Sequence, residues 1–232
     1  MAAIRSILFF IVFYGMTIPW VIAALIGALL GERPMHAVIY AWVRFHRQCA
    51  RVLLGIRVKL EGAVPDGQFL FAAKHQAMFE TLDFLNLLDT PAPVLKKELT
   101  EIPGWGWLAV QYGGIAVDRS GGAATMRAML KRTRKVLAHG RSVVIFPEGT
   151  RVPPGEQPEL QAGFAGLYKM FKLPVVPIAI KSGHVWPKDS WIKHPGTVTY
   201  RFFDPIPVGL PREEIEERVH RLINTFENEV TD

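Results

Sequence analysis

The sequence predicts a layered α/β domain preceded by N-terminal membrane helices. Two observations lead to this fold class. A long uncharged apolar segment lies within the first 30 residues, and from Ile56 onward short apolar runs alternate with helical patterns. A length of 232 residues favours one sizeable core. We therefore divide the chain into N-terminal membrane-anchoring helices, residues 1–54, and an α/β domain, residues 55–232.

The first segment, Ser6–Leu30, contains 25 residues without a charge. As a helix it is about 37 Å long, more than the roughly 30 Å of a bilayer core. This length also exceeds that of ordinary core helices and of the apolar region of a signal peptide. Pro19, near its middle, favours a kink or a break. Two arrangements follow: one tilted span, or a broken hairpin that enters one leaflet. A buried core helix is the third alternative.

The next segment, Met35–Leu54, has the pattern of a helix that lies in a membrane interface. Its apolar residues alternate with Arg44, Arg47 and Arg51, which we expect at the lipid phosphates. We expect Trp42 at the level of the headgroups, where tryptophan is most favourable.

The positive charge of the chain is concentrated in its N-terminal quarter. The formal net charge is +6, and residues 61–232 contribute none of it because they carry 20 basic and 20 acidic side chains. A nucleic-acid-binding protein usually carries such an excess on its folded domain, so we predict no nucleic-acid partner. If the first segment spans, the basic residues that follow it place the α/β domain on the cytoplasmic face, of the plasma or inner membrane in a bacterium.

Seven short segments, several of them continuous apolar runs, predict the strands of the α/β domain. They are Ile56–Leu60, Gln68–Ala73, Pro93–Lys96, Gly114–Val117, Ser142–Phe146, Val175–Ile180 and Val198–Phe203. Amphipathic patterns predict helices over Gly122–His139 and Arg212–Val230. The first of these helices is also basic, which indicates a solvated face or a second membrane-facing patch. The single cysteine, Cys49, and the scattered histidines show no metal-ligand spacing, so we predict no metal and no disulfide.

The stretch Lys74–Glu80 has the residue types of an acid–base pair. His75 lies where a strand ends, the usual position of functional groups in α/β sheets. Glu80 lies five residues further on, and a turn into a helix brings its carboxylate toward the imidazole. A carboxylate there fixes the tautomer and stabilises the imidazolium that forms when His75 takes a proton. Taken alone, the pair favours the alternative of a surface histidine near a helix start.

Two further stretches indicate an anion site. In Phe146–Arg151 a Pro-Glu-Gly turn follows a strand and places Glu148, Thr150 and Arg151 at the sheet edge. Arg151 suits bidentate phosphate binding, while Glu148 accepts hydrogen bonds from hydroxyl groups or pairs with an arginine. The strand at Gly113–Arg119 ends in a second arginine, Arg119.

Taken in order, these blocks resemble the lysophosphatidate (1-acylglycerol-3-phosphate) acyltransferase family. The family has a His with an acid five positions on, a Gly-x-Ile-x-Val-x-Arg strand, a Phe-Pro-Glu-Gly-Thr-Arg turn and a Val-Pro-Ile strand. Matching residues are His75 and Glu80, Gly113–Arg119, Phe146–Arg151 and Val176–Ile178. The resemblance covers about residues 55–205, and four blocks in order are much more specific than one.

The resemblance implies an acyltransferase domain with a mixed central sheet, and it implies the roles of the site residues. His75 is the general base on the sn-2 hydroxyl of lysophosphatidate, and Glu80 is its partner. Lys97, Arg119 and Arg151 hold the acceptor phosphate, and Glu148, Gly149 and Thr150 shape the glycerol site. The co-substrate is acyl-CoA or acyl-carrier protein, the product is phosphatidate, and no cofactor is needed.

Three residues of the first block depart from the family pattern. Lys74 stands where Asn is usual, Ala77 where Ser is common, and Glu80 where Asp is usual. One alternative function is therefore a catalytically silent membrane lipid-binding protein on the same fold. Another is an acyltransferase that acts on a different lyso-lipid, such as a lyso-ornithine lipid.

Overall fold

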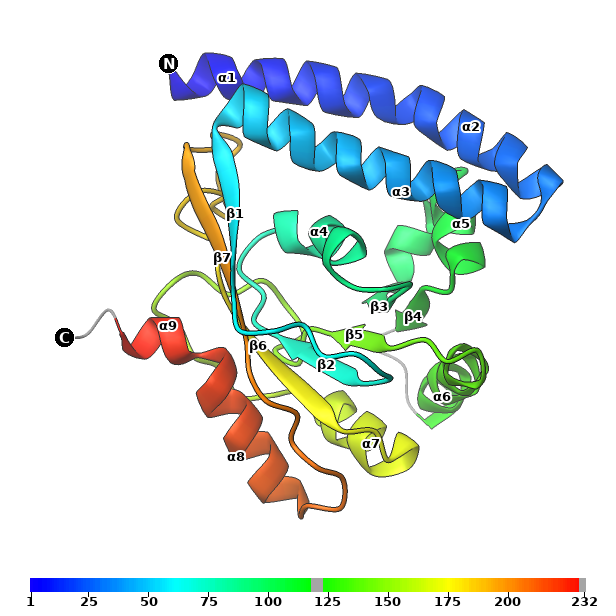
Figure 1. Cartoon of the computed structure of the whole chain (residues 1–232), viewed down its shortest axis with the longest axis vertical. Helices are drawn as coiled ribbons and strands as arrows, with labels where there is room; N and C mark the ends of the chain where they lie inside the picture. The colour runs from blue at the N-terminus through cyan, green and yellow to red at the C-terminus, as the bar shows by residue number, and fades with distance from the viewer. Residues whose placement is uncertain (118–122, 230–232) are drawn as a thin grey trace.

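A computed structural model of the chain describes residues 1–117 and 123–229 (Figure 1). Its centre is a seven-stranded mixed sheet with the order β1-β7-β6-β2-β5-β3-β4. The strands are β1 (Ile56–Glu61), β2 (Leu70–Ala73), β3 (Ala92–Lys96), β4 (Ile115–Val117), β5 (Val143–Ile145), β6 (Val175–Lys181) and β7 (Gly196–Phe202). All neighbouring strands are parallel except β6 and β7, which are antiparallel. The seven predicted strands are therefore confirmed, with ends shifted by one or two residues.

Both faces of the sheet are covered, because the central strands are apolar on both sides. In β2, Phe71 and Ala73 point into one core cluster, whereas Leu70 and Ala72 point into the other. This is the two-residue alternation of a strand, here with apolar side chains at every position.

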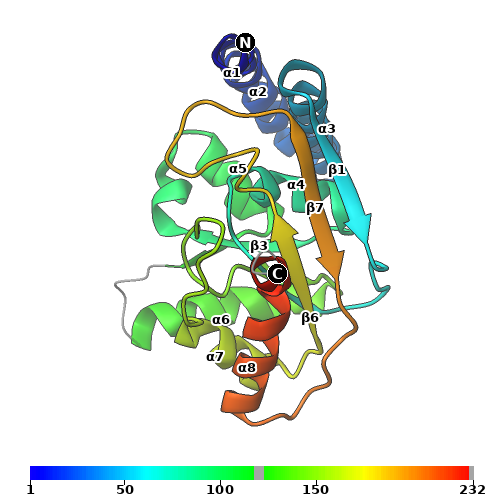
Figure 2. The ribbon, with the colours of Figure 1, turned by 90° about the vertical axis from the view of Figure 1, so that its left-hand side faces the viewer.

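Helices form the two outer layers (Figure 2). On one face lies α4 (Phe79–Leu87), beneath a pair of N-terminal helices; α5 (Trp105–Tyr112) packs beside that pair. On the other face lie α6 (Ala123–Ala138), α7 (Ala162–Phe171), α8 (Arg212–Ile223) and α9 (Thr225–Asn228). A 3₁₀ turn, η3 (Lys97–Glu101), follows β3. The predicted helix over Arg212–Val230 is interrupted at Asn224, whose backbone leaves the α-helical conformation between α8 and α9.

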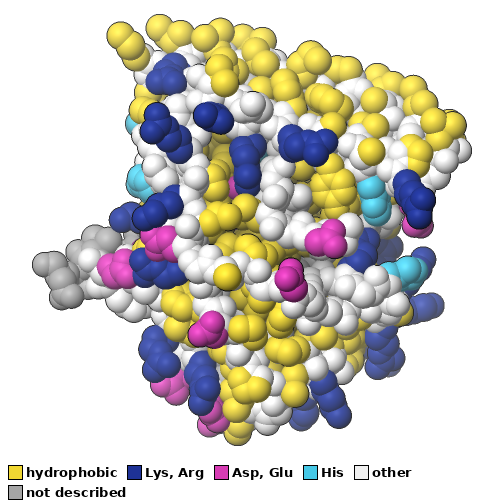
Figure 3. All heavy atoms as spheres, in the orientation of Figure 1, with side chains coloured by type: hydrophobic (Ala, Val, Ile, Leu, Met, Phe, Trp, Pro, Cys, Tyr) yellow, Lys and Arg dark blue, Asp and Glu magenta, His cyan; other side chains and the backbone are white. Residues whose placement is uncertain are grey.

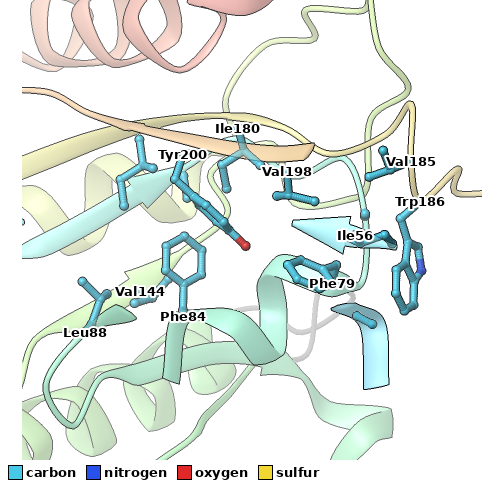
Figure 4. Packing of buried hydrophobic residues seen from close by; sticks show 14 of the residues in the cluster. Ile56, Phe79, Phe84, Leu88, Val144, Ile180, Val185, Trp186, Val198 and Tyr200 are labelled. Atoms are coloured by element: carbon cyan, nitrogen blue, oxygen red, sulfur yellow. The ribbon is translucent and has the colours of Figure 1, made fainter. Parts of the chain in front are cut away.

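The core between α4 and the sheet is rich in aromatic rings (Figure 4). Phe84 of α4 meets Tyr200 of β7 edge to face with ring centroids 5.8 Å apart. Phe79, the first residue of α4, packs against Trp186, which follows β6. These contacts fix α4, and with it the turn that precedes it, against the sheet.

The N-terminal residues form a helical hairpin, which we define as residues 2–54. One arm comprises α1 (Ala2–Phe9), the π-helical turn η1 (Phe10–Tyr14) and α2 (Gly15–Leu30); the other comprises α3 (Glu32–Cys49) and the π-helical turn η2 (Ala50–Leu54). The chain turns at Gly31, whose φ of +122° suits glycine. The interpretation with a break at Pro19 is wrong, because the helix continues through this residue from Ala2 to Leu30.

The outer side of the hairpin is apolar, with Lys and Arg side chains below it (Figure 3). Large side chains such as Ile11, Ile18 and Leu29 are exposed there. Within the described residues, Ala2–Leu30 is the one helix that is long and apolar enough to cross a membrane. Exposed apolar surface of this extent indicates contact with a membrane or with a partner.

Two predictions for α3 are wrong because the helix turns these residues inward. Trp42 faces the other arm of the hairpin, where its Nε1 donates a hydrogen bond to Thr17 Oγ1. Arg47 forms an ion pair with the buried carboxylate of Asp83 in α4, with Nε and Oδ1 2.6 Å apart. Arg44 and Arg51 are exposed, and their placement at lipid phosphates stays a prediction.

Candidate functional site

The turn between β2 and α4 brings His75 and Glu80 together. His75 follows the end of β2, and Glu80 is the second residue of α4, so its carboxylate points back across the turn. His75 Nδ1 lies 3.1 Å from Glu80 Oε1. Because a carboxylate only accepts, Nδ1 carries the hydrogen and Nε2 is left with a free lone pair. The sequence prediction of this pairing agrees with the geometry.

The carboxylate of Glu80 is buried and fixed by hydrogen bonds. Its Oε1 also accepts from the backbone N–H groups of Gln76 and Ala77, at 2.8 and 2.6 Å. Its Oε2 accepts from Ser182 Oγ at 3.0 Å. Four donors thus hold a carboxylate at a helix N-terminus, where a negative charge is favoured. The extra methylene of Glu, compared with Asp, is accommodated by the turn.

The imidazole of His75 is fixed from a second side. It stacks on Phe146, which follows β5, with ring centroids 3.9 Å apart and planes inclined by 19°. Its backbone carbonyl accepts from Val152 N–H at 2.7 Å, and its backbone N–H donates to Glu148 Oε2 at 3.0 Å. Only 15% of the His75 side chain is exposed, so the ring is mostly enclosed by its neighbours but still reached by solvent.

Glu148 has a partner that the sequence did not indicate. The buried Lys74 donates from Nζ to Glu148 Oε1 at 2.6 Å, and neither side chain is exposed. Burial raises the pKa of the Glu148 carboxyl, while the charge of Lys74 and the bond from His75 N–H oppose that shift. Both oxygens of Glu148 therefore bind protein groups, and it pairs with a lysine rather than an arginine.

The other residues of this turn line the same edge of the sheet. Gly149 has a φ of +72°, and a Cβ there would lie 2.7 Å from Gln161 Cγ, so the turn requires glycine. Thr150 is exposed and Arg151 half-buried. Since Arg151 directly precedes Val152, it is tied to the main chain of His75.

Lys193, in the loop between β6 and β7, was missed by the sequence analysis. Burial and the positive charge of Arg151 lower its pKa to about 8. Lys193 Nζ donates hydrogen bonds to the backbone carbonyls of Pro187 and Ser190, and the charge of Arg151 acts on it from another part of the chain. No sequence signal marked this lysine, because its neighbourhood to Arg151 exists only in the folded chain.

Two predicted site residues remain, Lys97 and Arg119. Lys97 is exposed at the start of η3, directly after β3. Arg119 lies outside the described residues. In the part of the chain that the structure describes, no group of three or more His, Cys, Asp or Glu side chains is arranged to hold a metal ion.

An apolar cavity opens between the hairpin, α4 and α5. The hairpin contributes Trp20, Ala24 and Trp42, and α5 contributes Trp105, Leu108 and Ala109. Thr81, Leu82 and Leu85 line it from α4, the helix that carries Glu80. The cavity therefore shares α4 with Glu80, and its apolar lining suits a hydrocarbon chain.

Comparisons with known proteins agree with this geometry. The sequence pattern of the family described as Acyltransferase matches residues 55–181. The 1-acyl-sn-glycerol-3-phosphate acyltransferase of Pseudomonas aeruginosa is 34% identical over 200 residues, which cover 84% of this chain and 78% of that one. The enzyme of the same name from Saccharomyces cerevisiae is 28% identical, over 92% of this chain and 72% of its own. This chain belongs to the acyltransferase family.

Other relatives are longer or more distant. The 1-acyl-sn-glycerol-3-phosphate acyltransferase of Cocos nucifera is 27% identical over 70% of this chain, and the match spans 54% of the coconut protein. The crystal structure of the 1-acyl-sn-glycerophosphate acyltransferase from Thermotoga maritima is similar in fold, with a TM-score of 0.77 and 24% identity. The match covers 100% of this chain and 98% of the Thermotoga chain, so the fold includes the hairpin.

Proposed function

We propose that the chain transfers a fatty acyl group from a thioester to the sn-2 hydroxyl of 1-acyl-sn-glycerol 3-phosphate, giving phosphatidate. The observation that carries this proposal is the contact of 3.1 Å between His75 Nδ1 and a Glu80 carboxylate that three further donors hold in place. The curated relatives from Pseudomonas and Saccharomyces bear the name of this activity and support the choice of acceptor.

The arrangement supports a direct transfer with His75 as general base. Nε2 of His75 takes the hydroxyl proton while the hydroxyl oxygen attacks the thioester carbonyl carbon. Glu80 stabilises the positive charge that develops on the ring. The carbon–sulfur bond then breaks, and the departing thiolate receives a proton, so no nucleophilic side chain is needed. The donor is acyl-CoA or acyl-carrier protein, a co-substrate, and no further cofactor takes part.

Cationic side chains hold the acceptor phosphate in this proposal. Arg151, Lys97 and Arg119 bind it, with Arg151 suited to a bidentate contact. Gly149 and Thr150 shape the glycerol side, and Glu148 does so through its bonds to Lys74 and His75. The apolar cavity takes a hydrocarbon chain of one of the two lipid substrates.

The hairpin associates with the membrane that contains the acceptor and product. Its apolar outer side and the positive charge of residues 1–60 support this placement. We propose that the α/β domain lies on the cytoplasmic face, where the thioester donor is made available.

The decisive experiment measures thiol release from palmitoyl-CoA by detergent-purified protein, with a panel of lyso-lipid acceptors. We expect release with lysophosphatidate and loss of release in His75→Ala, with an unchanged thermal midpoint. If thiol were released only with another acceptor, such as a lyso-ornithine lipid, the proposed mechanism would stand and that lipid would be the acceptor. No release with CoA or carrier-protein donors would favour the silent lipid-binding protein.

A further inference from the structure

We propose that Gln76 and Glu227 are positioning residues, through which the C-terminal helices hold His75 in its working orientation. This inference rests on the proposed function. Lys74 and Gln76 flank His75 after β2, and their side chains bind Asn224 and Glu227 near the C-terminus, whereas the His75 ring binds Glu80. Lys74 and Gln76 are buried, whereas His75 is partly exposed.

The hydrogen bonds of Gln76 have a fixed direction. Its Oε1 accepts from the backbone N–H groups of Ser182 and Gly183, at 2.8 and 2.9 Å. Its Nε2 must therefore face away from them, and it donates to Glu227 Oε1 at 2.6 Å. Flipping the amide would place Nε2 against two N–H donors.

Both carboxylate oxygens of Glu227 must therefore accept hydrogen bonds. Its other oxygen, Oε2, accepts from the backbone N–H of Gly155. Glu227 is 6% exposed, and its partners among these contacts carry no charge. A side chain that carries a donor at position 227 would face the Gln76 amide nitrogen or the Gly155 N–H. One buried donor would then lack an acceptor, which destabilises the fold.

A second connection runs parallel to the first. Lys74 Nζ donates to Asn224 Oδ1 at 2.7 Å and to the backbone carbonyl of Glu156 at 2.8 Å. Asn224 stands where α8 gives way to α9, one helical turn before Glu227. Because the predicted helix is interrupted at Asn224, the side chains of Asn224 and Glu227 reach the two residues that flank His75.

The same connections hold the other parts of the candidate site. Gly155 and Glu156 belong to the loop that begins with Arg151, and Val152 N–H binds the His75 carbonyl. Ser182, which binds Gln76 through its N–H, also binds Glu80 through its hydroxyl. One buried hydrogen-bond network thus holds His75, its carboxylate partner Glu80 and the loop that begins with Arg151 in their relative positions. Glu227 lies outside the segment matched by the family, residues 55–181.

An exchange of the two side chains tests this inference. Glu227→Gln places a donor against Gln76 Nε2 or Gly155 N–H, and Gln76→Glu places two carboxylates in contact. The double variant restores all four bonds. Its carboxylate at position 76 accepts from Ser182 N–H, Gly183 N–H and the new amide at position 227, and the oxygen of that amide accepts from Gly155 N–H. Glu214→Gln on α8 is the matched control, since Glu214 pairs with exposed Arg218.

We expect kcat to fall about 10- to 100-fold in each single variant and to recover to within about threefold in the double variant. All measurements are made on detergent-purified full chain, about 20 °C or more below each thermal midpoint. The second measurement is the rate at which diethyl pyrocarbonate modifies His75, followed by peptide mass spectrometry. This rate should rise in the single variants, return in the double variant and stay unchanged in Glu214→Gln.

A single variant with the wild-type kcat and His75 reactivity would overturn the proposal, and so would a folded double variant that stays inactive. A loss of activity that only follows the unfolded fraction would show a purely structural role and overturn it too. If Glu227→Gln does not fold, the kcat of the double variant tests the proposal on its own, and a recovery to near the wild-type value supports it. The chemical modification of His75 can be measured without acyl transfer. If His75→Ala remained active, the general-base role of His75 would be rejected, while the modification rates would still test the positioning role of Gln76 and Glu227.

Discussion

At the scale of single residues, the chemistry of the site depends on the individual contacts of His75, Glu80 and Lys74. The sequence predicted the proximity of His75 and Glu80 from their spacing alone. It did not indicate the Phe146 ring that stacks on His75 or Ser182, which binds Glu80. It also left open the role of Lys74, which is completely buried and paired with Glu148. These partners are about 70 to 100 residues apart in the chain, beyond the reach of any spacing argument.

Glu80→Gln separates charge from geometry. The amide oxygen keeps the three contacts of Oε1, and the amide nitrogen donates to the Ser182 hydroxyl, which reorients. We expect a nearly unchanged thermal midpoint and a kcat about 100-fold lower, because the charge that stabilises the imidazolium is lost. Ser182→Ala is the control, with a loss below about threefold. A fully active Glu80→Gln would show that His75 needs no charged partner.

His46, in α3, makes the stability of the protein dependent on pH. It is buried among aromatic rings with Nδ1 unpartnered, and burial lowers its pKa to about 3. The unfolded chain binds a proton at His46 below about pH 6.5, and the folded chain does not, so stability falls as the pH is lowered from 6.5 toward 3. At pH 5 the loss is about 2 kcal/mol.

His46→Leu removes this contribution. We expect the variant to lose less stability than the wild type between pH 7.5 and 5, measured as the free energy of unfolding in detergent. His139→Leu, at an exposed position, is the control and should keep the wild-type dependence. Identical pH dependence in His46→Leu would contradict the assignment.

At the scale of elements, apolar runs predicted the central strands because these are buried on both faces, and alternating patterns predicted β1 and β7. The helices α5 and α7 received no individual prediction, since glycines and a short length weaken their patterns. The stretch Gly104–Ala109, which also fits a relaxed dinucleotide pattern, lies mostly in α5 and lines the apolar cavity. The end of the C-terminal helix at Asn224 follows from its bonds to Lys74 and His220.

The cavity between α4, α5 and the hairpin predicts selection by chain length. Ala109→Phe fills part of its wall, so a long chain no longer fits completely. We expect kcat/KM for a 16-carbon substrate chain to fall at least about tenfold relative to a 12-carbon chain. Gln111→Phe, exposed on the same helix, is the control. Equal losses for both lengths in Ala109→Phe would place the hydrocarbon chain elsewhere.

At the scale of the whole molecule, charge and apolar surface are separated. The hairpin carries an exposed apolar side together with the exposed Arg33, Arg44 and Arg51, while residues 61–232 carry no net charge. Arg47 is not part of this set, because it joins α3 to α4 through Asp83.

Replacing Arg33, Arg44 and Arg51 by Gln tests the membrane-facing side. Each arginine near an anionic surface contributes about 1 kcal/mol, so the triple variant should bind anionic vesicles about 100-fold more weakly at low salt. Lys131, Arg132 and Lys135 on α6 form the comparison set, and their replacement should change binding little. A larger effect from the α6 set would assign the membrane-facing side to that helix.

The sequence by itself determined the strands, the apolar first helix, the family blocks and the spacing of His75 and Glu80. These features depend on local periodicity or on residues within one turn of each other. Tertiary structure alone decided that the chain turns at Gly31 rather than Pro19, that Trp42 and Arg47 face inward, and that Lys193 approaches Arg151. It also decided that Glu227 reaches Gln76. Hydrogen bonds and burial between distant segments have no periodic signature, so only the folded chain reveals them.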